Sequence, residues 1–385
     1  MDNASALDHE ACYRAVLARD ARFDGRFFGC VKTTGIYCRP VCPARTPKRE
    51  NMVFVLTAAA AEEAGFRACL RCRPETAPDM GAWRGTSNTV SRALALIEAG
   101  ALDSRSEFGG DIDALAGRLG VGERHLRRLF RQHLGAAPVS VAQTRRVLLA
   151  KALIHQTDLS MAQVALGAGF GSVRRFNETF QALYGRPPSA LRRRGERAHE
   201  GGVRLSLPYR PPYDWETMFA ALTARGAAVD GRRWSRGLVR DVDGTEGLVT
   251  VEPTETGRVS VCVETDDLKA LPGVLARVRR VFDLSADPEA IGRDLSADPV
   301  LRPLVEARPG LRLPCDWTDD GAEAPNDRLA DATLAARAEA WRPWRAYGAL
   351  HLALAGINDA DPRIASPRVT SEDDDVESDN AQRAA

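Results

Sequence analysis

Two pairs of closely spaced cysteines are the residues of this chain best suited to chemistry. Cys38 and Cys42 are separated by three residues, Cys69 and Cys72 by two, and 26 residues lie between the pairs. Zn²⁺ takes four thiolate ligands in a tetrahedron, usually from two short-spaced pairs on turns. In a reducing compartment such a cluster indicates a metal site rather than disulfides. The spacing therefore predicts that these four cysteines bind Zn²⁺.

The remaining cysteines stand apart from this cluster. We expect buried or incidental thiols at Cys12, Cys30, Cys262 and Cys315.

Two roles are open for the cluster. Spacing alone favours a closed, purely structural zinc site. The surroundings of Cys38 favour a reaction, because it follows Thr33–Thr34–Gly35 and has basic neighbours that would attract a phosphate backbone. These neighbours are Arg39, Arg45, Lys48 and Arg49. Zinc keeps a thiolate deprotonated at neutral pH, so a ligand can also be a nucleophile.

Charge is unevenly distributed along the 385 residues, a length that predicts two to four domains. Residues 81–200 carry a net charge of +8 and residues 201–385 a net charge of −9. A basic central segment favours a nucleic-acid partner. No segment is apolar for long enough to span a bilayer, and the N-terminus has acids where a signal peptide is basic. We therefore expect a cytoplasmic protein, associated with the nucleoid, without a membrane partner.

The segments that must position these residues follow from capping residues and apolar periodicity. A helix is expected from Asp8 to Asp20, then two β-rich runs and an Ala-rich helix from Thr57 to about Gly65. A linker follows at Pro74–Asn88, and the pattern from Thr89 to Leu191 is almost wholly helical. Beyond Gly202, short alternating strands precede an amphipathic helix, and the end of the chain, SEDDDVESDN, predicts a disordered acidic tail.

The helical third contains an internal repeat. ALAGRLGVGERHLRRLF and AQVALGAGFGSVRRFNETF each contain a short helix with a small residue, a Gly-containing turn and a second helix. The expected apolar anchors are Val121, Leu126 and Phe130 in the first copy, and Phe170, Phe176 and Phe180 in the second. Ala116 and Ala165 allow the close helix approach of a helix-turn-helix, and a helix at about Val139–Gln156 would separate the copies.

The exposed positions of the second helix in each copy are polar and mostly basic. Seven arginines and one acid, Glu123, lie between Arg118 and Arg146. Such side chains at the start of a recognition helix reach base edges, and flanking arginines hold phosphates. The candidate DNA-binding residues are Arg124, His125, Arg127, Arg128, Ser172, Arg174, Arg175 and Asn177. The duplication and the segment FGSVRRFNETFQALYGRPPSALR closely resemble the DNA-binding domain of AraC-type transcriptional regulators, over about Val90–Arg194.

The cysteine segment also has a resemblance. TTGIYCRPVCPAR, KRENMVF and AGFRACLRCRPE look like the zinc-binding methyl-acceptor domain of the Ada adaptive-response proteins, over residues 10–78. The resemblance implies that Cys38 accepts a methyl group from a methyl phosphotriester in DNA, while the other three cysteines remain ligands. It also implies that Thr34, Arg45 and Arg67 face the DNA backbone.

The last half resembles AlkA-type DNA-3-methyladenine glycosylases in two pieces. Residues 203–313 are similar to the N-terminal α+β domain of that family, and Ala338–Gly356 resembles its closing helix. The helix-hairpin-helix and catalytic aspartate expected between them are not found in the sequence. The carboxylates there are Asp316, Asp319, Asp320, Asp327 and Asp331. We expect an internally deleted, inactive module in which Trp317, Trp341 and Trp344 belong to the core.

Together these patterns predict a multidomain α+β protein. The expected parts are a zinc-bound α+β domain (1–80), an all-α double helix-turn-helix domain (84–196), an AlkA N-terminal-like α+β domain (202–313), a remnant of a glycosylase helical domain (314–358) and a disordered acidic tail (359–385). The expected function is single-turnover repair of DNA methyl phosphotriesters, coupled to transcriptional activation of the alkylation response. Double-stranded DNA and RNA polymerase are the expected partners. The alternatives are a working glycosylase fused to a regulatory module, and a transcription factor whose zinc is purely structural. No PCHR motif of an O6-methylguanine acceptor is present, so that activity is not expected.

Overall fold

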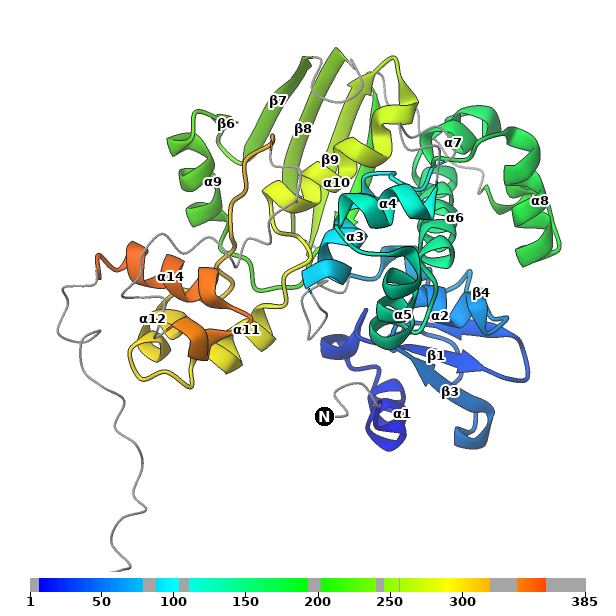
Figure 1. Cartoon of the computed structure of the whole chain (residues 1–385), viewed down its shortest axis with the longest axis horizontal. Coiled ribbons are helices and arrows are strands. Elements are labelled where there is room, and N and C mark those ends of the chain that lie inside the picture. Colours follow the sequence, from blue (N-terminus) through cyan, green and yellow to red (C-terminus); the bar gives the residue numbers. More distant parts are fainter. Residues whose placement is uncertain are drawn as a thin grey trace, which may run out of the picture.

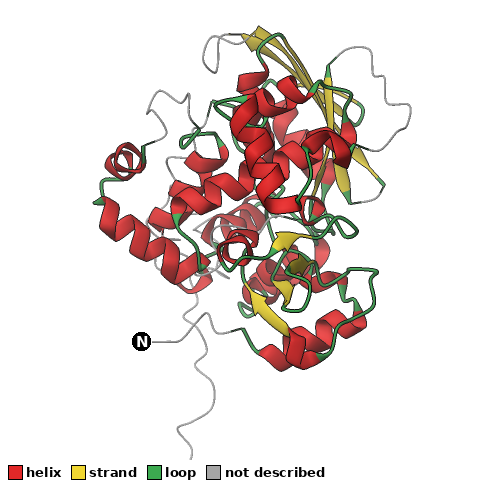
Figure 2. Cartoon of the chain, turned by 90° about the vertical axis from the view of Figure 1, so that its right-hand side faces the viewer, coloured by secondary structure: helices red, strands yellow, loops and turns green. Residues whose placement is uncertain are grey.

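The computed structural model describes residues 7–78, 88–103, 111–192, 202–239, 246–255, 257–318 and 338–357. Within these ranges the chain is a multidomain α+β protein, as predicted. A small sheet and a larger sheet lie at opposite ends of the view in Figure 1, with helices between them. Figure 2 shows the same separation after a 90° turn. The expected acidic tail at 359–385 lies outside the described residues.

The cysteine domain (residues 7–78) is built on a four-stranded sheet in the order β3-β1-β2-β4. Strands β2 and β4 are parallel, and the other neighbours are antiparallel. Its elements are α1 (His9–Ala18), β1 (Phe28–Val31), β2 (Ile36–Cys38), β3 (Met52–Val55), α2 (Ala58–Glu63), β4 (Arg67–Ala68) and the 3₁₀ turns η1 (Ala21–Phe23), η2 (Arg49–Asn51) and η3 (Pro74–Thr76). Both predicted helices are present, because Asp8 and Thr57 cap their first turns.

The helical region (residues 88–192) contains the predicted repeat. Its helices are α3 (Asn88–Glu98), α4 (Ile112–Arg118), α5 (Glu123–Leu134), α6 (Pro138–Gln156), α7 (Met161–Gly167), α8 (Val173–Tyr184) and the 3₁₀ turn η4 (Pro188–Leu191). Leu126 and Phe130 on α5 and Phe176 and Phe180 on α8 are fully buried, so both helices are anchored as expected. The pairs α4–α5 and α7–α8 are the two helix-turn-helix units.

Helix α6 joins the two units and is buried along most of its length. The buried positions are Pro138, Ala142, Thr144, Arg146, Val147, Ala150, Lys151, Leu153 and Ile154. They do not form a single stripe, because α6 contacts α2 and η3 of the cysteine domain, η4 of its own region and β5 (Val203–Pro208) of the next domain. A helix buried on several sides is a central element of the fold.

The sheet domain (residues 202–318) contains an antiparallel sheet in the order β5-β9-β8-β7-β6. Its further elements are α9 (Trp215–Ala224), β6 (Ala228–Asp230), β7 (Arg233–Val239), β8 (Glu246–Thr254), β9 (Arg258–Thr265), η5 (Leu268–Ala270), α10 (Leu271–Val281), α11 (Pro288–Leu295) and α12 (Leu301–Ala307). The sheet shares a continuous apolar core with the second helix-turn-helix unit, in which Phe176 and Val261 both take part.

The last described helices form a compact cluster with α11 and α12. They are η7 (Glu339–Trp341) and α14 (Arg345–Leu354). The indole N–H of Trp341 donates to Asp298 at 2.9 Å, and that of Trp344 donates to Asp294 at 2.9 Å. Trp317, Trp341 and Trp344 are all buried, as predicted for core residues. None of the helices in the described ranges has the length and apolar character needed to cross a membrane.

Candidate metal centre and nucleic-acid interface

The four predicted cysteine ligands converge at one end of the small sheet. Cys38 is the last residue of β2, and Cys69 directly follows β4. These two strands run in parallel, with Tyr37 opposite Ala68, so their carboxyl ends meet. The amide of Cys69 donates to the carbonyl of Tyr37 at 3.0 Å, which fixes the two cysteines side by side.

The second cysteine of each pair lies on the turn that follows its strand. The amide of Cys42 donates to the carbonyl of Arg39 at 3.1 Å, closing the first turn. Backbone amides also point at the sulfurs: Arg39 N–H donates to Cys72 Sγ and Arg71 N–H donates to Cys69 Sγ, each at 3.4 Å. Amide donors stabilise a thiolate over a thiol, so these turns favour the charged form of the ligands.

The arrangement fits tetrahedral zinc. All four Sγ atoms lie within 4.8 Å of one another. A Zn–S distance of about 2.3 Å requires sulfurs about 3.8 Å apart, which needs only a small contraction of the cluster. Thiols elsewhere are different: burial raises the pKa of Cys12 to about 11 and of Cys30 to about 12. Those two remain protonated, in agreement with their expected role as buried thiols.

Access to the cluster is one-sided. Cys69 and Cys72 are buried, whereas Cys38 and Cys42 are partly exposed. A large substrate such as a DNA backbone therefore has better access to the first cysteine pair than to the second.

The predicted ring of basic residues around Cys38 is wrong at one position. Arg39 turns inward, where its Nε donates to Asp24 Oδ1 at 2.8 Å and its Nη1 to the carbonyl of Cys72 at 3.1 Å. Because its guanidinium is paired with the carboxylate of Asp24, Arg39 stabilises the cysteine turns and does not form part of the phosphate-attracting surface. Arg45 remains exposed, whereas Arg49 pairs with Glu10 at 2.7 Å.

The other residues expected to face the DNA backbone lie on the strands and turn next to Cys38 in the small sheet. Thr34 is exposed in the hairpin turn between β1 and β2, where its amide donates to the carbonyl of Val31 at 3.2 Å. Arg67 is partly buried on β4, paired in register with Ile36. The parallel pairing of β2 and β4 therefore brings Arg67 to the strand that ends in Cys38.

The candidate DNA-binding residues of the helical region are exposed on the first two turns of α5, and at the N-cap and first two turns of α8. They are Arg124, His125, Arg127, Arg128, Ser172, Arg174, Arg175 and Asn177. Several of them have local partners, among them Arg128 and His125, whose side chains lie 3.2 Å apart. Arg127 pairs with Glu123 at 2.5 Å and Arg174 with Glu178 at 2.8 Å, both exposed pairs that a phosphate can replace. Ser172 caps α8, because its Oγ accepts the amide of Arg175 at 3.2 Å.

Not all arginines counted as basic surface are free to contact DNA. Arg145 Nη2 donates to Asp103 at 2.6 Å, and Arg146 is buried against the same carboxylate. Arg131 pairs with Glu63 of the cysteine domain at 2.6 Å. Three of the seven arginines between Arg118 and Arg146 therefore hold the fold together, which the count of charges alone did not reveal.

Two buried acids that we did not predict connect the cysteine turns to α6. Glu62 accepts the hydroxyl of Tyr37 at 3.1 Å and that of Thr144 at 2.7 Å. Glu75 pairs with Lys151 at 2.7 Å. The signal for the second contact is present in the sequence, because Lys151 interrupts the apolar run VLLAKALI. A lysine in such a run needs a buried partner, although the run does not identify it.

Comparison with known proteins agrees with this architecture. Residues 11–75 match the metal binding domain of Ada, residues 115–194 a helix-turn-helix domain, and residues 204–318 the AlkA N-terminal domain.

Among relatives, the probable bifunctional transcriptional activator/DNA repair enzyme AlkA of Mycobacterium tuberculosis is 41% identical over 353 residues, covering 89% of this chain and 69% of the relative. The bifunctional transcriptional activator/DNA repair enzyme Ada of Escherichia coli is 33% identical over 209 residues, covering 54% of each chain. Among solved structures, the DNA methyl phosphotriester repair domain of E. coli Ada is 49% identical, covers 19% of this chain and 80% of its own, and has a TM-score of 0.18.

Proposed function

Since this chain belongs to the family of the bifunctional transcriptional activator/DNA repair enzyme AlkA of M. tuberculosis, we propose that it repairs DNA methyl phosphotriesters by methyl transfer to Cys38 and then activates transcription. The observation that carries this proposal is the one-sided cysteine cluster. Cys38 lies on its open side, close in sequence to the exposed Thr34 and Arg45, and the cluster is joined to two helix-turn-helix units.

The chemistry is a single displacement. The Cys38 thiolate attacks the methyl carbon of the triester, an S–C bond forms, and the C–O bond breaks with its electron pair remaining on the phosphate oxygen. The products are an ordinary phosphodiester and S-methylcysteine, and no proton is transferred. A thioether is not hydrolysed under these conditions, so each molecule reacts once.

The residues of this chain prepare Cys38 for that step. Cys38, Cys42, Cys69 and Cys72 would hold Zn²⁺, which keeps thiols deprotonated at neutral pH when it is bound. The amides of Arg39 and Arg71 support the charge on neighbouring sulfurs. Thr34, Arg45 and Arg67 would hold the phosphates on either side of the neutral triester.

Methylation also provides the regulatory signal. The transfer removes one negative charge from the cluster, so the surface that faces DNA repels phosphates less. Arg124, His125, Arg127 and Arg128 on α5, and Arg174, Arg175 and Asn177 on α8, would then contact two successive major grooves, with Ser172 at the start of α8. Bound at its operator on the nucleoid, the protein would recruit RNA polymerase.

Base excision is not part of the proposal. A glycosylase must extrude a base into a pocket and place a carboxylate beside it. Trp317, Trp341 and Trp344 are buried, so none of them is placed to act as a wedge. Asp316 is exposed and lies 3.5 Å from Arg225, and Asp319, Asp320, Asp327 and Asp331 lie outside the described residues. A working glycosylase would instead release free 3-methyladenine with many turnovers.

Mass spectrometry of the zinc-loaded protein after incubation with methylated DNA tests the proposal. We expect one added methyl group on the Cys38 peptide and none after Cys38→Ser. Cys315→Ser is the matched control, because Cys315 is a partly exposed thiol outside the cluster. Zinc content must be measured for each variant. An unmodified Cys38 in folded, zinc-loaded wild-type protein would leave a transcription factor with a structural zinc site.

A further inference from the structure

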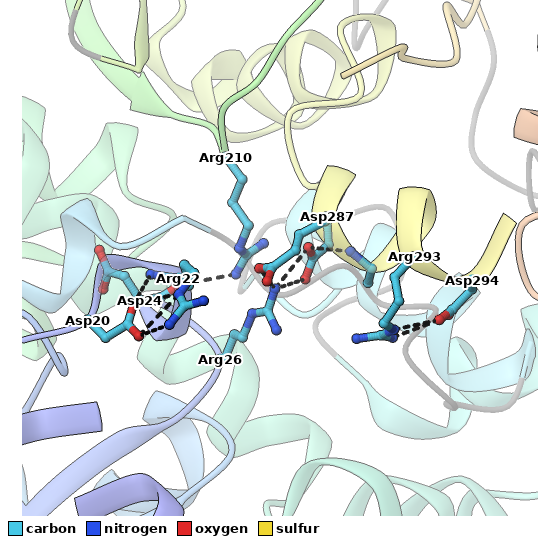
Figure 3. Close-up of polar contacts among 10 residues, drawn as sticks. Asp20, Arg22, Asp24, Arg26, Arg210, Asp287, Arg293 and Asp294 are labelled. Carbon is cyan, nitrogen blue, oxygen red and sulfur yellow. Dashed lines mark hydrogen bonds and ion pairs between the residues drawn. The ribbon is translucent and has the colours of Figure 1, made fainter. Parts of the chain in front are cut away.

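The sheet domain touches the cysteine domain through a short turn, residues 24–26, that lies between η1 and β1 (Figure 3). Arg26 reaches the first turn of α11. Its Nη2 lies 3.1 Å from the carboxylate of Asp287 and 2.7 Å from Glu289 Oε2. Asp287 is fully buried and the Arg26 side chain is only 16% exposed, so this is an interface contact rather than a surface pair.

A second contact holds the same turn from the sheet domain. Arg210, which is buried just after β5, donates through Nη2 to the carbonyl of Asp24 at 3.3 Å. Gly25, between the two contacts, has φ +73°, and a Cβ there would lie 2.1 Å from the carbonyl oxygen of Pro78. Only glycine allows the turn to sit this close to its neighbours.

Asp24 connects this interface to the metal centre. Its backbone carbonyl accepts from Arg210 of the sheet domain, while its carboxylate accepts from Arg39. Arg39 in turn donates to the carbonyl of Cys72. A single residue thus bridges the sheet domain and the turn that carries a metal ligand.

The sheet domain is also fixed to the helical region. The two share one apolar core, and the amide of Ser206 on β5 donates to Gln156 Oε1 at the end of α6, at 2.8 Å. The sheet domain therefore contacts the cysteine domain at the turn of residues 24–26, and it contacts the helical region through the shared apolar core and the Ser206–Gln156 hydrogen bond.

We infer that the sheet domain acts as an intramolecular clamp that holds the cysteine domain in one orientation on the helical region through Arg26–Asp287 and Arg210–Asp24. This gives the AlkA-like part a role that requires no base excision. Its consequence for operator binding rests on the proposed function: the cluster and the recognition helices approach DNA as one rigid unit.

Hydrogen–deuterium exchange on the full, zinc-loaded chain tests the clamp itself. Arg26→Ala removes the ion pairs with both Asp287 and Glu289, and Asp287→Asn/Glu289→Gln removes the two carboxylate charges from the other side. The asparagine retains an oxygen to accept the Ala290 amide and cap α11. Arg22→Ala is the matched control, because Arg22 is a 70% exposed side chain whose ion pair is with Asp20 on the same domain. For either interface variant we expect faster exchange both in residues 24–31 and in α11. For the control we expect the exchange rates of the wild type in both segments. Changes confined to the mutated side, or no change, would overturn the clamp.

Operator binding and methyl transfer are measured on the same samples. We expect about tenfold weaker operator binding for Arg26→Ala, equivalent to about 1.4 kcal/mol, with Cys38 methylated to the wild-type extent. Wild-type operator affinity in a variant whose two segments both exchange faster would overturn the rigid-unit consequence. Failure of methyl transfer in the wild type would remove the proposed function, whereas the exchange data would still decide the clamp.

Discussion

Glu75 and Lys151 form an ion pair of 2.7 Å in which both side chains are fully buried. Glu75 lies three residues after Cys72, and Lys151 lies in the middle of α6. Burial would raise the pKa of Glu75, but the adjacent ammonium group of Lys151 holds that pKa below its usual value. The pair therefore connects the turn that carries a metal ligand to α6, the helix between the two helix-turn-helix units.

Removing one partner of this pair should destabilise the protein strongly. Lys151→Met removes the buried cation at 2.7 Å and leaves Glu75 paired with the partly exposed Arg73, and we expect a loss of about 3–5 kcal/mol in the free energy of unfolding. The double variant Glu75→Gln/Lys151→Met should recover part of that loss, because it leaves no buried charge. Urea denaturation measures the free energy of unfolding of each variant. Arg174→Met, at the exposed pair with Glu178, should have no measurable effect. If Lys151→Met and Arg174→Met changed the free energy of unfolding equally, a structural role for the buried pair would be contradicted.

Zinc removal should unfold the cysteine domain selectively. The domain is small, and its cluster would keep four closely packed sulfurs without a central cation, so its folding free energy depends on the metal. After chelation we expect hydrogen exchange to increase in β1, β2 and β4 and at the contact between α2 and α6. The five-stranded sheet should stay protected and serves as the internal control. Unchanged exchange around Cys38 would show that the cluster does not stabilise the domain through a metal.

Methylated and unmethylated protein should differ most in operator affinity at low salt. The difference arises from one negative charge near the phosphate backbone, and salt screens that repulsion. Titration of a labelled operator at about 50 and 200 mM salt should show the ratio of the two dissociation constants shrinking as salt increases. A ratio independent of salt would point to a conformational signal instead.

Arg175→Ala should weaken operator binding and reduce its salt dependence by about one counterion if this residue holds a phosphate. If Arg175 reads a base, the loss should instead be specific to one operator position. Arg232→Ala is the matched control, because Arg232 is exposed on the turn before β7, within the sheet domain. Fluorescence anisotropy with operator and scrambled duplexes separates the two roles. Equal losses for both variants would rule out a specific contact by Arg175.

Asp283→Asn should stabilise the protein at neutral pH. Burial raises the pKa of Asp283 to about 6 from 3.8, despite the opposing effects of Arg312 and hydrogen bonds from Tyr347 and Leu313. Because the folded pKa lies above the unfolded one, stability is lost as pH rises from about 4 to about 6. The variant should therefore be up to about 3 kcal/mol more stable at pH 7, and no more stable at pH 4.

Two features make this variant a clean probe. Asp283 has φ +46°, a conformation that asparagine tolerates well. Burial lowers the pKa of His351 to about 4, which makes the wild type less stable toward acid, but this effect is common to both proteins and cancels in their difference. Asp230→Asn, on the exposed β6, is the control. An equal gain at pH 4 and pH 7 would show that the carboxyl charge is not the cause.

Local patterns predicted much of the fold and the cluster. The spacing of Cys38, Cys42, Cys69 and Cys72 predicted one metal site, because short-spaced pairs on turns need only two strand ends to meet. Apolar anchors four residues apart predicted α5 and α8, because helical periodicity brings such residues to one face. Each of these signals consists of residues spaced only a few positions apart, so it can be recognised without knowledge of the tertiary structure.

The sequence by itself determined which residues could bind a metal or read DNA. Only the tertiary structure decided which charged residues are occupied elsewhere: Arg39 by Asp24, Arg145 by Asp103, Arg26 by Asp287 and Lys151 by Glu75. The physical reason is that the local sequence around a charged residue is the same whether its side chain faces solvent or pairs with a buried carboxylate. Its partner can lie up to 261 residues away, as for Arg26 and Asp287, and is brought to it only by the packing of the domains.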